Sequence, residues 1–233
     1  MRPEVKGFIL KEYGAWSVMI ISCLVGVGVS RAWSWNMAPL FLALAFLINS
    51  KQAYMKWVRR ADDRAAFAIF LIQILVAAVM LAVVFRGDML RLLPLLAIPA
   101  AYLVINKLRG EHFILTELLG FVLLSLAAVL AKFLLTDDLD GRLLIGTALY
   151  FAAGVFKVKA IVLRKKRERI LAVLAVAVAV IVYGIMHIPL IILLPLADNL
   201  IAAATLYKVK LRTTGWIEVI KSLLFLGLFI AFF

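Results

Sequence analysis

The stretch KVKAIVLRKKRER, residues 157–169, carries seven lysine and arginine residues between two long apolar runs. Apolar runs of this length predict membrane-spanning helices, because about 20 helical residues cross the hydrocarbon core of a bilayer. A strongly basic junction between two such runs is typical of the cytoplasmic side of a membrane protein. The rest of the chain repeats this pattern in both directions.

Nine apolar runs account for most of the 233 residues, and basic residues gather at every second junction between them. This alternation follows the positive-inside rule and predicts a cytoplasmic N-terminus and a C-terminus on the far side of the inner membrane. The predicted fold class is an all-α polytopic membrane protein, with about nine helices in one bundle and a single domain over residues 1–233. The runs are residues 16–30, 34–49, 65–85, 90–106, 113–135, 143–162, 170–186, 188–207 and 216–233.

The composition excludes an ordinary soluble domain. Hydrophobic residues make up 66% of the chain and the mean hydropathy is +1.10, whereas soluble domains are about 45–50% apolar. Topology and anionic lipid headgroups explain the net charge of +13 without a nucleic-acid partner. The single cysteine, Cys23, excludes a disulfide framework within the chain and a metal-binding cysteine pair. No cofactor or metal site is predicted.

Local features refine the predicted helices. Four prolines fall inside two of the apolar runs, where a missing backbone N–H predicts kinks: Pro94, Pro99, Pro189 and Pro195. Gly26 and Gly28 in the first run and Gly120 in the fifth are predicted positions of close helix packing. Asp62 and Asp63 are predicted to cap the third helix.

Ionisable residues inside the apolar runs are the candidates for function, because charges are costly in a bilayer. Glu117 and Asp198 lie too deep for casual solvation and need partners of opposite charge. Glu218 and Lys221 form a further pair at i, i+3 spacing. Most of the set falls in the predicted cytoplasmic half, whereas Arg91 and Lys132 fall near the outer surface. We therefore expect a polar cavity open to the cytoplasm; the alternative is a set of interhelical pairs that only fix the bundle.

Four strings in this order resemble the YwiC-like family of bacterial integral membrane proteins. They are KEYGAW (residues 11–16), KLRGEHFILTELLGF (107–121), YFAAGVFKVKA (150–160) and LRTTGWIE (211–218). The family pattern usually reads Glu-His-Gly-Ala-Trp at the first site, and Tyr13 stands here where the histidine is expected. The resemblance implies an integral membrane protein and no assigned reaction.

The nine runs are also distantly similar to the UbiA superfamily of intramembrane prenyltransferases, which carry Asp-rich motifs that hold magnesium and a prenyl diphosphate. Asn49 matches the leading Asn of the first motif, but Lys51 follows where an acidic residue is wanted. Lys157 and Lys159 stand where the aspartates of the second motif would lie. Because magnesium prefers oxygen ligands, standard magnesium-dependent prenyl transfer is not expected, and enzymatic activity is left open.

The leading hypothesis is a cavity that binds an anionic lipid or a prenyl-phosphate-like amphiphile, with membrane lipids as partners and no nucleic acid. The lysines would bind the anionic head as charge-assisted donors, and the acidic residues would orient it or handle protons. One alternative is a small proton-coupled transporter or permease, with Glu117 and Asp198 as carriers. Another is a non-catalytic membrane assembly subunit. The predicted ligand-binding residues are Lys51, Lys157, Lys159, Asn49, Glu12, Glu117 and Asp198.

Overall fold

The structure, a computed structural model, describes residues 13–59, 63–111, 113–205 and 211–233, with the backbone alone for residues 211 and 212. Within these residues all regular structure is helical, as the sequence predicts. The elements are α1 (Tyr13–Ser30), α2 (Met37–Arg59), α3 (Arg64–Val84), α4 (Met89–Leu92), η2 (Leu93–Leu96), α5 (Ala97–Arg109), α6 (Ile114–Thr136), α7 (Gly141–Leu163), α8 (Lys166–Ile185), η3 (Leu190–Leu196), α9 (Ala197–Thr205) and α10 (Leu211–Phe232).

Seven helical segments in the described part of the chain are long and apolar enough to cross a membrane. Two more segments complete the nine predicted runs. One is α2, which is 23 residues long but carries polar residues such as Lys51 in its second half, and the other is the shorter apolar segment Leu190–Thr205. The seven are Tyr13–Ser30, Arg64–Val84, Met89–Arg109, Ile114–Thr136, Gly141–Leu163, Lys166–Ile185 and Thr213–Phe232.

Proline and aspartate shape the helices where the sequence predicts it. Pro94 lies in η2 and Pro195 lies in η3, so both break the α-helical geometry of their spans into a tighter 3-10 turn. Asp63 caps α3, since its carboxylate accepts a 2.9 Å hydrogen bond from the backbone N–H of Ala66. The predictions for Pro94, Pro195 and Asp63 are confirmed. Pro99 lies in the first turn of α5, which continues through it, so no break is found there. Pro189 is the N-cap of η3, and Asp62 lies outside the described residues.

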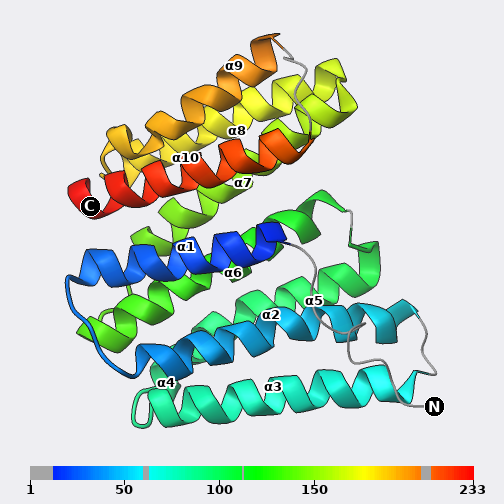
Figure 1. Cartoon of the computed structure of the whole chain (residues 1–233), viewed down its shortest axis with the longest axis vertical. Helices are drawn as coiled ribbons and strands as arrows, with labels where there is room; N and C mark the ends of the chain where they lie inside the picture. Colours follow the sequence, from blue (N-terminus) through cyan, green and yellow to red (C-terminus); the bar gives the residue numbers. More distant parts are fainter. Residues whose placement is uncertain (1–12, 60–62, 112, 206–210) are drawn as a thin grey trace.

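Helices α1 and α6 pack against each other in the middle of the bundle, with α2, α3 and α5 on one side and α7 to α10 on the other (Figure 1). Gly26 permits the close approach, because a Cβ atom there would lie 2.2 Å from the carbonyl oxygen of Ala128 on α6. Gly28 has the same role toward α10, where a Cβ atom would lie 2.2 Å from Ile230. The predicted close-packing role of Gly26 and Gly28 is confirmed. At Gly120 a Cβ atom would lie 3.6 Å from Tyr102, an ordinary van der Waals distance, so a close approach is not found there.

The two ends of the bundle differ in charge. We call the end where α1, α3, α6, α8 and α10 begin the basic end, since it carries the junctions rich in lysine and arginine (right in Figure 1). At the opposite end, Arg91 forms ion pairs with Asp88 and Asp137, and Lys132 lies 2.8 Å from both Asp138 and Asp140. These pairs join α4, α6 and the loop before α7 away from the basic end.

Candidate functional site

A cavity of about 1690 Å³ lies inside the bundle between α1, α2, α3, α5, α6, α7 and α10. Leucine, isoleucine, valine and aromatic side chains form most of its wall, so it is more apolar than the sequence predicts. The charged residues among its described lining all come from the half of the bundle nearer the basic end. They are Lys51, Glu111, Glu117, Lys159, Glu218 and Lys221.

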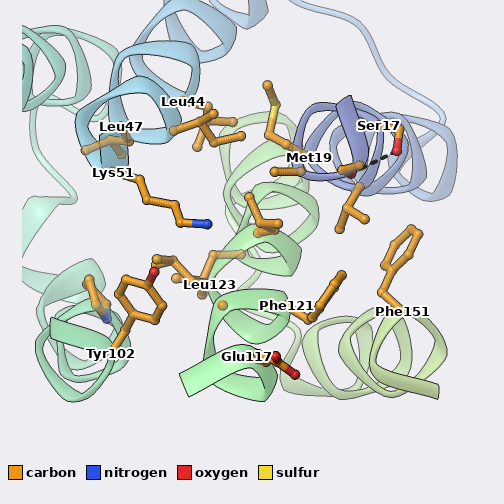
Figure 2. Close-up of a pocket in the computed structure, with 18 of the residues that line it drawn as sticks. Ser17, Met19, Leu44, Leu47, Lys51, Tyr102, Glu117, Phe121, Leu123 and Phe151 are labelled. Carbon is orange, nitrogen blue, oxygen red and sulfur yellow. Dashed lines mark hydrogen bonds between the residues drawn. The ribbon is translucent and has the colours of Figure 1, made fainter. Parts of the chain in front are cut away.

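The first polar region, the Lys51 corner, consists of Lys51, Tyr54, Tyr102, Glu111 and Thr116. Lys51 extends from α2 across the cavity toward α6 (Figure 2). Its ammonium lies 3.7 Å from Glu111, and Arg59 donates a 2.9 Å hydrogen bond to the other oxygen of the same carboxylate. Two cations therefore share one carboxylate here.

A buried hydroxyl completes the Lys51 corner on the α6 side. Thr116 is 1% exposed and lines the cavity, and its side-chain hydroxyl makes no hydrogen bond. Gly120 follows one turn later on the same face of α6. A Cβ atom at Gly120 would lie 3.6 Å from the ring of Tyr102 on α5, so this wall of the cavity is built by a small residue against an aromatic one.

The second polar region, the Tyr150 corner, consists of Tyr150, Gly154, Glu218, Lys221 and Ser222, from α7 and α10. Lys221 lies 3.1 Å from Glu218, at the i, i+3 spacing that the sequence shows. A Cβ atom at Gly154 would lie 3.5 Å from the Glu218 carboxylate, so the glycine leaves this carboxylate room. Between the two corners, Lys159 on α7 pairs with Glu117 on α6.

A buried charge network joins α7, α9 and α10 next to the Tyr150 corner. Lys157 on α7 has no exposed surface; it lies 2.6 Å from Glu218 and also pairs with Asp198 on α9. Lys221 lies 3.3 Å from Asp198 and donates a 2.6 Å hydrogen bond to the side chain of Asn199. Both lysines lie beside carboxylates, which is the condition under which buried charges are tolerated.

The structure brings together only part of the predicted site. Lys51, Lys159 and Glu117 line the cavity. Lys157, Asp198 and Asn49 are not among its lining residues; the first two belong to the network behind it. Glu12 lies outside the described residues.

Sequence reasoning did not assign four lining residues to the site: Glu111, Thr116, Tyr150 and Glu218. The spacing of Glu218 and Lys221 signals a charge pair on one helix face, but it does not tell which helices face that pair. For Thr116 and Tyr150 the sequence offers no signal, because a hydroxyl becomes notable only when packing leaves it without a partner.

These features define a helical multi-pass membrane protein with an internal cavity that is apolar along most of its wall and charged at one end. Residues 9–132 match the family model described as YwiC-like protein, and the chain belongs to that family. The matched range includes the whole Lys51 corner, whereas the Tyr150 corner lies beyond it. Neither the curated proteins nor the solved structures contain a match to this chain. No match links the chain to the UbiA superfamily, and that comparison stays a sequence-based prediction.

Proposed function

We propose that this YwiC-like protein binds an amphiphile whose anionic head lies in the Lys51 corner and whose tail fills the apolar cavity. In this proposal the basic end faces the cytoplasm, as the positive-inside rule predicts. The observation that supports the proposal is that Lys51 extends into a cavity whose wall is mostly apolar, with its ammonium 3.7 Å from the Glu111 carboxylate.

Electrostatics favours an anionic head at Lys51. The Lys51 ammonium lies 3.7 Å from the Glu111 carboxylate, beyond the length of a direct hydrogen bond. Lys159 and Lys221 lie closer to their carboxylate partners. An anionic head beside Lys51 would gain charge-assisted hydrogen bonds in an apolar environment.

The size and wall of the cavity support a ligand with a long apolar tail. Ligand pockets commonly measure about 300–1,000 Å³, and this cavity is larger, at about 1690 Å³. Leu44 and Leu47 on α2 face Leu123 on α6 across it (Figure 2). Contact with such a wall stabilises a tail through burial of apolar surface.

The remaining predicted residues take different roles in this proposal. Lys159 and Glu117, as lining residues, are placed to contact the ligand beside the head. Lys157 and Asp198 act indirectly: they hold Glu218 in position at the cavity wall. Asn49 is assigned no contact with the head, since it does not line the cavity.

The two alternatives fit the cavity less well. A proton-coupled transporter needs polar groups along the whole path, but near the opposite end the lining residues include Leu81, Met89 and Leu130. An assembly subunit requires no cavity at all. The amphiphile-binding function is therefore favoured over both.

Binding of oleate, a singly charged amphiphile with one acyl tail, tests the proposal. Native mass spectrometry of the purified protein should show at least about tenfold weaker oleate binding for Lys51→Gln than for wild type, because a charge-assisted contact is lost. Lys107→Gln is the matched control, since this exposed lysine of α5 does not line the cavity. Equal oleate binding by Lys51→Gln and wild type would contradict the proposed function.

A further inference from the structure

The turn between α7 and α8 carries the longest run of consecutive cations in the chain. We call its four residues, Arg164, Lys165, Lys166 and Arg167, the basic turn. Only two residues separate the helices, because α7 ends at Leu163 and α8 begins at Lys166. All four cations are exposed, at the basic end of the bundle (Figure 1). Since consecutive Cα atoms lie about 3.8 Å apart, four positive charges are concentrated within about 11 Å of backbone.

No carboxylate neutralises the basic turn within the described residues. None of its four side chains forms an ion pair there, and the neighbouring Glu168 forms none either. The lysines deeper in α7 differ, since Lys157 and Lys159 each pair with a carboxylate. Like charges held close together repel each other, so an anion that binds to the basic turn lowers its electrostatic free energy.

Arg169 fixes the basic turn against α9. Its guanidinium donates hydrogen bonds to the main-chain carbonyls of Ala203 at 2.6 Å and Ala204 at 3.1 Å, near the end of α9. The first turn of α8 is therefore held in place by a residue that is not itself part of the exposed run. A surface that is held in this way binds a ligand at a smaller ordering cost than a mobile loop does.

Apolar side chains border the basic turn on both helices. Val162 and Leu163 at the end of α7, and Ile170 in α8, are large apolar residues that are exposed. Apolar surface next to cations suits a phospholipid, because its acyl chains lie against the apolar residues while its head contacts the cations. A soluble anion such as free phosphate would use the cations alone.

We propose that the basic turn binds cardiolipin, a phospholipid whose head carries two phosphates, each with one negative charge. Arginine and lysine bind phosphate through charge-assisted hydrogen bonds, and basic surfaces at the cytoplasmic ends of membrane helices bind cardiolipin head groups. Four cations match two phosphates better than they match the single phosphate of phosphatidylglycerol. None of the four lines the cavity, so this lipid site is separate from the proposed amphiphile site and does not depend on it.

Native mass spectrometry of the detergent-purified protein tests the proposal with tetraoleoyl cardiolipin. The double variant Lys166→Gln with Arg167→Gln should bind cardiolipin at least about tenfold more weakly than wild type, because two charge-assisted contacts are lost. Lys107→Gln with Arg109→Gln is the matched control. It also removes one exposed lysine and one exposed arginine at the basic end, from the last turn of α5, and it should bind cardiolipin as wild type does.

Dioleoyl phosphatidylglycerol gives a second measurement on wild type alone. This lipid has the same tails and one phosphate, so it should bind at least about tenfold more weakly than cardiolipin. Equal weakening of cardiolipin binding in the two double variants would overturn the proposal, since any basic surface would then serve. Equal binding of both lipids to wild type would overturn it as well, and this comparison holds even if a variant fails to fold.

Discussion

Lys157 on α7 lies 2.6 Å from Glu218 on α10, and no part of Lys157 is exposed. The pair joins two helices whose remaining contacts include the Tyr150–Phe225 stack. Glu218 also lines the cavity, whereas Lys157 does not. Lys157, which the sequence predicts to bind a ligand, therefore holds the wall of the cavity in place instead.

Replacement of Lys157 by methionine should lower stability strongly. The change removes a cation that pairs with both Asp198 and Glu218, and removal of one partner from a buried ion pair costs about 3–5 kcal/mol. Thermal unfolding of the detergent-purified protein should show a clear loss in melting temperature. An unchanged melting temperature would mean that the network is not formed.

A double variant serves as the control for that prediction. In Lys157→Met with Glu218→Gln, one cation and one carboxylate are removed together, so Lys221 and Asp198 remain as a balanced pair. The double variant should be more stable than Lys157→Met alone, because no uncompensated carboxylate remains. If the two substitutions instead add their separate costs, the residues are not coupled.

The contact between α1 and α6 should not tolerate even one methyl group at Gly26. A Cβ atom there would lie 2.2 Å from the carbonyl oxygen of Ala128, a backbone atom that cannot move away by itself. Gly26→Ala should destabilise the protein by about 1–3 kcal/mol through overpacking. Gly184→Ala on α8 is the control, since no atom lies within 4 Å of its added Cβ. Equal melting temperatures for the two variants would contradict the packing of α1 on α6.

The Thr116 hydroxyl should lower the stability of the protein. Thr116→Val removes a buried hydroxyl without a hydrogen bond, so the protein should gain up to about 1 kcal/mol in stability. Thr147→Val is the comparison: its hydroxyl donates to the carbonyl of Leu143 at 2.7 Å, and this variant should lose stability. Melting temperatures measure both effects, and an equal loss of stability in the two variants would contradict the difference between the two hydroxyls.

Acid should weaken the ion pairs of Lys132 with Asp138 and Asp140, at the end opposite the basic end. Burial alone would raise the pKa of Asp140, but the hydrogen bond and charge of Lys132, with the backbone N–H of Arg142, hold that pKa below its ordinary value of 3.8. A carboxyl with a lowered pKa in the folded state contributes stability above its ordinary pKa, and this stability is lost as pH falls through the folded pKa.

Asp140→Asn tests directly whether Asp140 causes this loss of stability at low pH. The variant should lose about 1 kcal/mol near pH 7, where the ion pair is formed, and should show a shallower loss of stability than wild type below about pH 4. Melting temperatures across pH 3 to 7 measure both effects. Asp138→Asn, at a side chain that is 60% exposed, should change little. If the melting temperatures of wild type and Asp140→Asn fell in parallel with pH, the lowered pKa of Asp140 would be contradicted.

Much of the fold follows from the sequence because membrane helices obey simple constraints. Length and apolar content predict the spans, and the prolines predict their breaks; Pro94 and Pro195 lie in the 3-10 turns. Gly26 and Gly28 were identifiable as packing positions because only small residues let backbones approach closely in a membrane.

The candidate site was less predictable because it depends on helix rotation. Lys157 and Lys159 are two residues apart, which places them about 200° apart around α7. Only one of them can face the cavity, and the sequence does not say which one. Lys159 lines the cavity, and Lys157 points to α9 and α10. Lys51 was predicted because it stands where the resemblance to the UbiA superfamily expects an acidic residue, whereas Tyr150 required knowledge of the packing around it.

An experimental density map of the purified protein with oleate added would show whether the cavity holds an amphiphile. One elongated density is expected inside the cavity, with its head within hydrogen-bonding distance of the Lys51 ammonium and its tail against Leu44, Leu47 and Leu123. A map in which oleate occupies only the outer surface of the bundle, with the Lys51 corner empty of ligand, would contradict the proposed function.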